Sequence, residues 1–100
     1  MNSSHPLAGV YIAAVTPLHA QGSPDAEGVE QLLHFLAGRQ CHGILLLGTT
    51  GEGPSFSPAE RAQVFRAAAS TRQAFPSLRL LAGTGTPSLD ETIHLTRLAY

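Results

Sequence analysis

The chain has 100 residues and a net charge of −1, and these two properties exclude several classes of protein. Its six basic residues are all arginines and do not cluster, so we expect it to bind neither nucleic acid nor an anionic membrane surface. A single cysteine excludes an internal disulfide, and no cysteine or histidine pair has the spacing of a zinc site, so we expect no metal. Lysine is absent, so these residues supply neither a P-loop lysine nor a Schiff-base lysine.

The sequence contains no targeting or membrane-spanning pattern. No segment approaches the roughly 20 consecutive apolar residues of a membrane-spanning helix. Residues 1–6 carry no basic region of the kind that begins a secretory signal. We therefore expect a cytoplasmic protein.

The first predicted unit is a strand followed by a helix. Residues 9–15 form a short apolar run that ends before Pro17, because proline cannot donate to a strand ladder. The following turn contains Ser23 and Asp25, and either side chain can cap a helix. The spacing of the next apolar residues predicts a helix over 25–38. The apolar face of this helix consists of Val29, Leu32, Leu33 and Leu36.

The second unit repeats this order. Residues 43–48 form an apolar run bounded by glycines, which is typical of a strand buried on both faces. Ser57 and Glu60 then form a capping box with Pro58 between them, which predicts a helix over 58–73. We expect its buried face to comprise Val64, Phe65, Ala68 and Ala69. The side chains expected to point into solvent are Glu60, Arg61, Gln63, Arg66 and Arg72.

The third unit has the same features. Residues 78–83 are predicted to form a strand, and a second capping box at Ser88 and Glu91 predicts a helix over 88–100. Its apolar side chains are Leu89, Ile93, Leu95, Leu98 and Ala99. No stop signal precedes the last residue.

Three successive strand–helix units predict an α/β fold with parallel strands and right-handed crossovers. Two architectures are built from this unit, the open doubly wound sheet and the closed eight-stranded barrel. Three strands close no barrel and leave apolar faces uncovered. We therefore expect these residues to be the N-terminal part of a larger chain.

In both architectures, ligands bind at the carboxyl ends of the strands. The loops expected there, residues 16–18, 48–53 and 83–86, are rich in glycine and threonine, which suits a small anion. Nucleotide binding is disfavoured, because no lysine is present and Ser88 stands where a dinucleotide fingerprint has its third glycine. The alternative is that these glycines only allow tight turns.

Four segments in register carry a more specific signal. Residues 48–52, Gly-Thr-Thr-Gly-Glu, follow the second predicted strand. Residues 15–17 end the first predicted strand, residues 57–61 start the second predicted helix, and residues 83–85 end the third predicted strand. Together they resemble the dihydrodipicolinate synthase/N-acetylneuraminate lyase family, from about Gly9 onward.

The resemblance implies the first three units of a (β/α)8 TIM barrel, with residues 1–100 as part of that single domain. It implies a pyruvate-dependent class I lyase or aldolase, whose Schiff-base lysine and relay tyrosine lie on later strands. The segment alone would therefore be inactive. By the same resemblance, Thr50 holds the carboxylate of pyruvate or another 2-oxo acid, Thr49 contacts the substrate and relays protons, and Gly51 is a further substrate-binding residue. The family uses no cofactor, because the imine is the electron sink, and its members are often homotetramers.

The reaction itself stays open at this point. Gly53 stands where the synthases commonly carry a serine, so a 2-keto-3-deoxy sugar acid aldolase, an N-acetylneuraminate lyase and a non-catalytic small-anion-binding α/β protein remain alternatives. Cys41 and His42 are expected to point in opposite directions and to form no dyad. Glu52 is expected to bond the loop backbone or a neighbouring subunit rather than to act as an acid or base.

Overall fold

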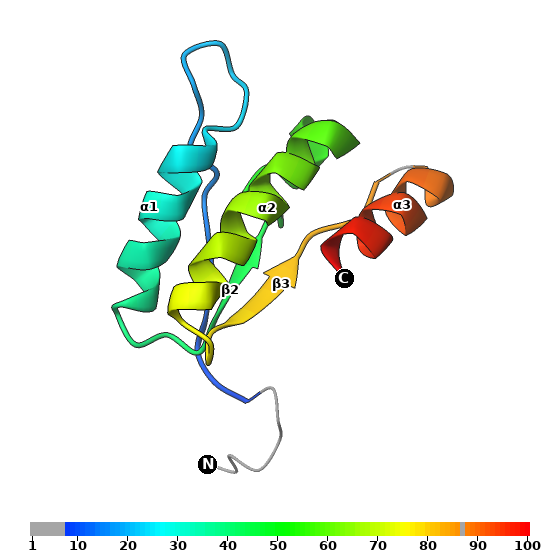
Figure 1. Cartoon of the computed structure of the whole chain (residues 1–100). Helices are drawn as coiled ribbons and strands as arrows, with labels where there is room; N and C mark the ends of the chain where they lie inside the picture. The colour runs from blue at the N-terminus through cyan, green and yellow to red at the C-terminus, as the bar shows by residue number, and fades with distance from the viewer. Residues whose placement is uncertain (1–7, 87) are drawn as a thin grey trace.

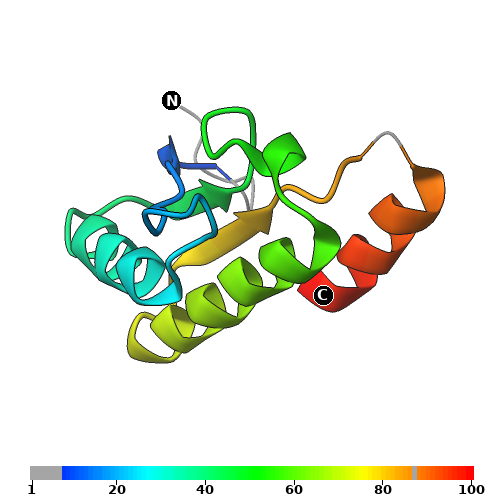
Figure 2. The same ribbon diagram turned by 90° about the horizontal axis from the view of Figure 1, so that it is seen from above.

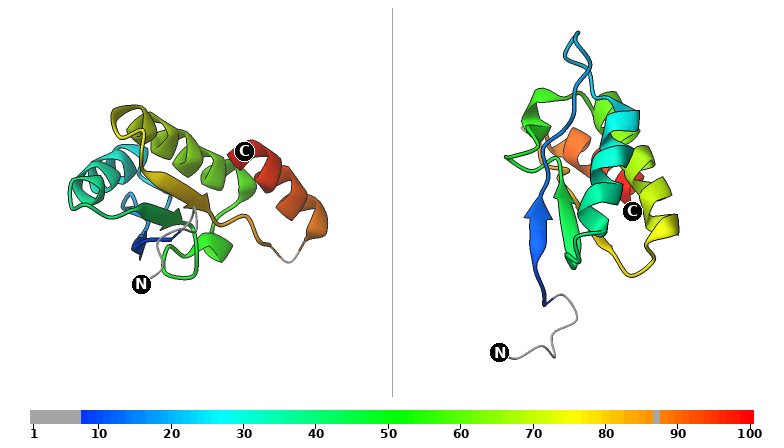
Figure 3. Two further views of the ribbon diagram at one scale, coloured as in Figure 1. Left: turned by 90° about the horizontal axis from the view of Figure 1, so that it is seen from below. Right: turned by 90° about the vertical axis from the view of Figure 1, so that its left-hand side faces the viewer.

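The computed structural model describes residues 8–86 and 88–100, which form a three-stranded parallel sheet with its helices on one face (Figure 1). The strand order is β1-β2-β3, and α1 and α2 pack side by side over the sheet (Figure 3). The third helix lies beside α2, beyond the edge strand β3 (Figure 2). The elements are β1 Tyr11–Ala13, α1 Ala26–Ala37, β2 Gly43–Leu46, the 3-10 turn η1 Gly53–Ser55, α2 Pro58–Ala74, β3 Arg79–Ala82 and α3 Leu89–Ala99.

The pairing confirms the predicted α/β fold with parallel strands. In the register, Ile44 of the central strand β2 lies opposite Ile12 of β1 and Leu80 of β3. Because all three strands are parallel, their carboxyl ends lie at the same edge of the sheet. None of the described helices is long and apolar enough to span a membrane.

The core lies between the sheet and the first two helices. Val29 and Leu33 of α1 and Val64 of α2 pack in one cluster with Ile44 and Leu46 of β2. Burying side chains of this size stabilises the fold by about 1.5–3 kcal/mol each. The predicted apolar face of α1 is confirmed, since its other two leucines are partly buried against the same cluster.

The helix starts follow the predicted capping chemistry, with one difference. The Asp25 carboxylate accepts from the Gly28 N–H at 3.1 Å, and Ser57 and Glu60 cap each other's backbone N–H groups at 3.2 and 2.9 Å. Ser88 likewise accepts from the Glu91 N–H. The Ser88 N–H, however, donates to the Thr86 hydroxyl instead of to Glu91, so the predicted second capping box is only half formed.

The exposure of α2 differs from the prediction at two positions. Arg61, expected in solvent, is 2% exposed, and Ala69, expected in the core, is exposed. Arg61 lies three and seven residues before Val64 and Ala68, and this spacing places it on their buried face. Its side chain is held there by hydrogen bonds to the backbone.

The apolar face of α3 is largely uncovered within the described chain. Leu95 is fully buried against α2, whereas Leu89 is 73% exposed. Ile93, Leu98 and Ala99 are also exposed. This agrees with the expectation that three units leave apolar faces uncovered, and of these side chains only Leu95 is buried in the described chain.

The strands are shorter than predicted. Strand β2 ends at Leu46 rather than at Gly48, because Leu47 adopts a left-handed conformation with φ of 57°. Strand β1 comprises three residues, and Val10 and Val15, which the prediction included, lie outside it and are exposed.

Thr71 on α2 offers a test of this core. Its hydroxyl is fully buried and has no hydrogen-bond partner among the described residues. Thr71→Val should raise the free energy of unfolding by about 1 kcal/mol, because it removes an unsatisfied polar group at nearly constant volume. Thr71→Ala should be about 1 kcal/mol less stable than Thr71→Val, since it also deletes a buried methyl group. Urea denaturation measures both, and a valine variant less stable than wild type would contradict the assignment.

Candidate functional site

Three loops meet at the carboxyl edge of the sheet. They are residues 14–18 after β1, residues 47–56 after β2 and residues 83–86 after β3, and Figure 2 looks down on this edge. The middle loop contains the two adjacent threonines that the sequence analysis singled out. Its conformation decides what the edge can bind.

The middle loop is folded back on itself by its own backbone. The Glu52 N–H donates to the Thr49 carbonyl at 3.1 Å, and the Gly53 N–H donates to the Gly48 carbonyl at 3.2 Å. Thr49 and Thr50 lie at its exposed tip. Within the described residues, neither hydroxyl and neither backbone N–H of this pair has a hydrogen-bond partner. Four donors are therefore free to meet a ligand.

Gly51 is the buried side of this loop and ties it to the first strand. Its carbonyl accepts a 2.7 Å hydrogen bond from the Thr16 hydroxyl. A Cβ on Gly51 would lie 2.9 Å from the Ala14 carbonyl oxygen, so a larger residue would displace the loop from β1. Thr16 lies in one of the segments that resemble the family, but its role could not be predicted from the sequence, because its partner is 35 positions away.

The Leu47 carbonyl is the point where the second and third loops pack together. A Cβ on either Gly53 or Gly83 would overlap this carbonyl group. Gly83 also donates its N–H to the Leu46 carbonyl at 2.7 Å. The left-handed conformation of Leu47 costs about 1–2 kcal/mol, and these contacts hold it in place.

Arg61 is the main residue that the sequence analysis missed. Its guanidinium donates to the carbonyls of Gly83 and Gly85 at 3.2 and 2.9 Å, and its Nε donates to the Phe56 carbonyl at 3.4 Å. Burial lowers the pKa of Arg61, and the Glu91 carboxylate partly opposes this shift. Arginine nevertheless remains protonated at neutral pH. A buried cation thus joins the second loop to the third.

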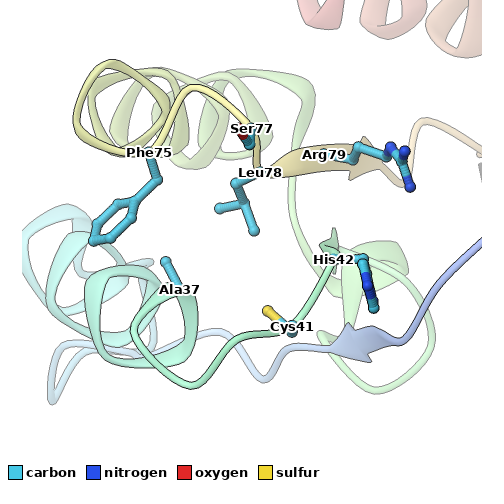
Figure 4. A pocket seen from close by; sticks show the side chains of 7 residues that line it. All are labelled: Ala37, Cys41, His42, Phe75, Ser77, Leu78 and Arg79. Carbon is cyan, nitrogen blue, oxygen red and sulfur yellow. The ribbon is translucent and has the colours of Figure 1, made fainter.

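The remaining candidates lie elsewhere or are not engaged. Cys41 and His42 line a cavity of about 350 Å³ at the opposite, amino end of the strands (Figure 4). The Cys41 thiol donates to the Leu36 carbonyl, whereas His42 Nδ1 accepts from the Val10 N–H, so the two form no dyad. The Glu52 side chain is exposed and bonds no loop backbone among the described residues. No three metal-ligating side chains gather within residues 8–86 and 88–100.

The packing at Leu47 predicts that alanine is tolerated differently at two glycines of this edge. Gly53→Ala should lower the free energy of unfolding by about 1–3 kcal/mol, because the new methyl overlaps the Leu47 carbonyl. Gly85→Ala is the matched control, since a Cβ there meets nothing within 4 Å. It should change stability by less than about 0.5 kcal/mol. Urea denaturation compares them, and equal losses would refute the packing argument.

Comparison with known proteins shows which family the chain resembles. The sequence model of the Dihydrodipicolinate synthetase family matches residues 6–100. The chain is 37% identical over 94 residues to a 4-hydroxy-tetrahydrodipicolinate synthase of Herminiimonas arsenicoxydans, covering 93% of this chain and 31% of that protein. It therefore spans about a third of the length of that relative.

Solved structures agree. The chain superposes with a TM-score of 0.86 and 27% identity on YagE, a prophage protein of the dihydrodipicolinic acid synthase family from E. coli K12 in complex with pyruvate, covering 95% of this chain and 31% of that one. It superposes on the N-acetylneuraminate lyase of Proteus mirabilis with a TM-score of 0.85 and 33% identity, covering 93% and 31%. The three units match the N-terminal part of TIM barrels of dihydrodipicolinate synthase structures. The chain belongs to the dihydrodipicolinate synthase/N-acetylneuraminate lyase family.

Proposed function

We propose that the protein containing this chain is a pyruvate-dependent class I lyase or aldolase whose Thr49–Gly51 loop binds the carboxylate of a 2-oxo acid. The observation that supports it most is the pair of exposed threonines with free hydroxyl and N–H donors at the carboxyl end of β2. The family's relative YagE was solved with pyruvate, which is itself a 2-oxo acid with a carboxylate.

The chemistry of a carboxylate matches these donors. A carboxylate accepts several hydrogen bonds, and bonds to a charged acceptor are about twice as strong as neutral ones. Thr50 can offer a hydroxyl and an N–H from one residue, and Gly51 keeps the backbone beside it close to β1. We assign carboxylate binding to Thr50 and Gly51 on this basis.

Thr49 is assigned a second task, the transfer of protons. A hydroxyl can accept one proton and donate another in a single relay step, although it is neither an acid nor a base by itself at neutral pH. It therefore needs a titratable partner, and the family resemblance implies a tyrosine from a later strand. The same resemblance implies a lysine whose amine condenses with the C2 carbonyl of the 2-oxo acid and releases water. The resulting imine accepts the electron pair when the carbon–carbon bond breaks.

Gly53 bears on which reaction of the family the protein catalyses. Where synthases commonly carry a serine, this residue offers no hydroxyl, and its packing against the Leu47 carbonyl leaves no room for a side chain. The missing hydroxyl counts against the synthase reaction. It keeps two alternative reactions open, cleavage of a 2-keto-3-deoxy sugar acid and cleavage of N-acetylneuraminate. By resemblance we also propose a homotetramer, which light scattering of the intact protein would measure.

The proposal predicts a covalent adduct. Incubating the intact gene product with pyruvate and borohydride should trap the imine as a stable secondary amine on one lysine outside this segment. Intact-protein mass spectrometry should show one reduced pyruvate per subunit. An unchanged mass, with a known class I aldolase trapped in parallel, would exclude the Schiff-base mechanism and leave the non-catalytic anion-binding alternative.

Substituting the two threonines is predicted to affect different kinetic parameters. Thr50→Val should weaken pyruvate binding about tenfold or more, because it removes a hydrogen bond to a charged group. Thr49→Val should lower kcat about 100-fold or more, as expected for loss of a proton-transfer group. Thr71→Val on α2 is the control, because the Thr71 hydroxyl bonds no other described residue, and it should change neither value. The trapping assay and steady-state kinetics measure these effects, and unchanged pyruvate affinity in Thr50→Val would remove the assigned site.

A further inference from the structure

Arg61 is a buried cation without a buried counter-ion. Its side chain is 2% exposed, and no carboxylate among the described residues lies within ion-pair distance of it. Its partners are the main-chain carbonyls of Phe56, Gly83 and Gly85. Burying an unpaired charge is costly, and an apolar residue of similar volume often stabilises a core better. Core stability alone therefore gives no reason for an arginine here.

The three carbonyls lie on two of the site's loops, and they hold the middle loop at both ends. Phe56 ends this loop, and its N–H donates to the Gly53 carbonyl at 3.1 Å. Gly83 packs against the Leu47 carbonyl, where the same loop begins. A guanidinium that binds both Phe56 and Gly83 thus fixes the distance between the two ends of the segment that carries the threonine pair.

We propose that Arg61 is a positioning residue that clamps the loop of residues 47–56 against residues 83–86 and so holds the donors of Thr49 and Thr50 in the geometry that binds the substrate carboxylate. This inference rests on the proposed function. It differs from a packing role, because it assigns the effect to the planar fork of donors. It also differs from an electrostatic role, which any cation at this position would fill.

Three variants of the intact gene product separate these roles. Arg61→Met removes the donors and the charge while keeping the apolar stem, and Arg61→Lys keeps the charge but replaces the fork with a single ammonium. Arg66→Met is the matched control, because Arg66 is an exposed arginine on the same helix and bonds none of the loops. Each variant is measured for pyruvate KM and kcat, and for amide hydrogen exchange of peptides covering 47–56, 83–86 and 26–37.

We expect Arg61→Met to raise the pyruvate KM about tenfold or more, because the Thr50 donors move, and to lower kcat as well, because Thr49 lies on the same loop. Exchange in 47–56 and 83–86 should accelerate, while α1 stays protected. Arg61→Lys should recover only part of the affinity, because one ammonium replaces a fork that spans carbonyls on two loops. The control should match wild type. An unchanged pyruvate KM, whether or not thermal stability falls, would mean that Arg61 only packs in the core and would overturn the proposal.

Two further outcomes are decisive. Full recovery of KM in Arg61→Lys would show that charge suffices and would also overturn the clamp. If Arg61→Met does not fold, Arg61→Lys is used for the test. Wild-type hydrogen exchange together with a wild-type KM in Arg61→Lys would then refute the clamp proposal. The proposed function fails separately: if wild-type protein traps no pyruvate, the exchange measurements still decide whether Arg61 clamps the loops.

Discussion

The carboxyl edge of this sheet depends on one backbone carbonyl. Leu47 turns left-handed directly after β2 and presents its carbonyl to two glycines from different loops. Gly53 and Gly83 approach so closely that neither could carry a side chain without moving the chain. The Gly83 N–H reaches the Leu46 carbonyl beside it. The second and third loops therefore share one packing contact, and the position of the threonine tip follows from it.

Local signals in the sequence predicted most of the fold. Asp25, Ser57 and Glu60 lie within one turn of the N–H groups they cap, so their bonds can be inferred from spacing alone. The alternation of short apolar runs with capped helices is likewise enough to predict parallel strands. For the site, the sequence predicted its location at the carboxyl edge of the sheet. The pair of threonines was identified only by the family resemblance.

What the sequence could not predict depends on distant partners. Arg61 was expected in solvent because charged residues usually are, and the carbonyls that hold it lie 22 and 24 residues away on another loop. The Thr16 bond spans 35 residues. Leucine rarely adopts a positive φ, so the sequence gives no signal that the strand ends before Leu47. On α3, periodicity identified the apolar face, but only contact with α2 at Leu95 decided which part of it is buried.

The residues that shape the candidate site are therefore different from those proposed to bind the ligand. Thr49 and Thr50 are exposed and bond nothing else in the described chain, so water can satisfy them until a ligand arrives and little is lost by leaving them free. Thr16 and Arg61 donate hydrogen bonds to main-chain carbonyls of the loops, and Gly83 packs against the Leu47 carbonyl. Because backbone carbonyls are the same in every sequence, such supports hold the loop whatever side chains it carries. Under the proposed function, the residues that select the second substrate can therefore change without rebuilding the loop that binds the carboxylate.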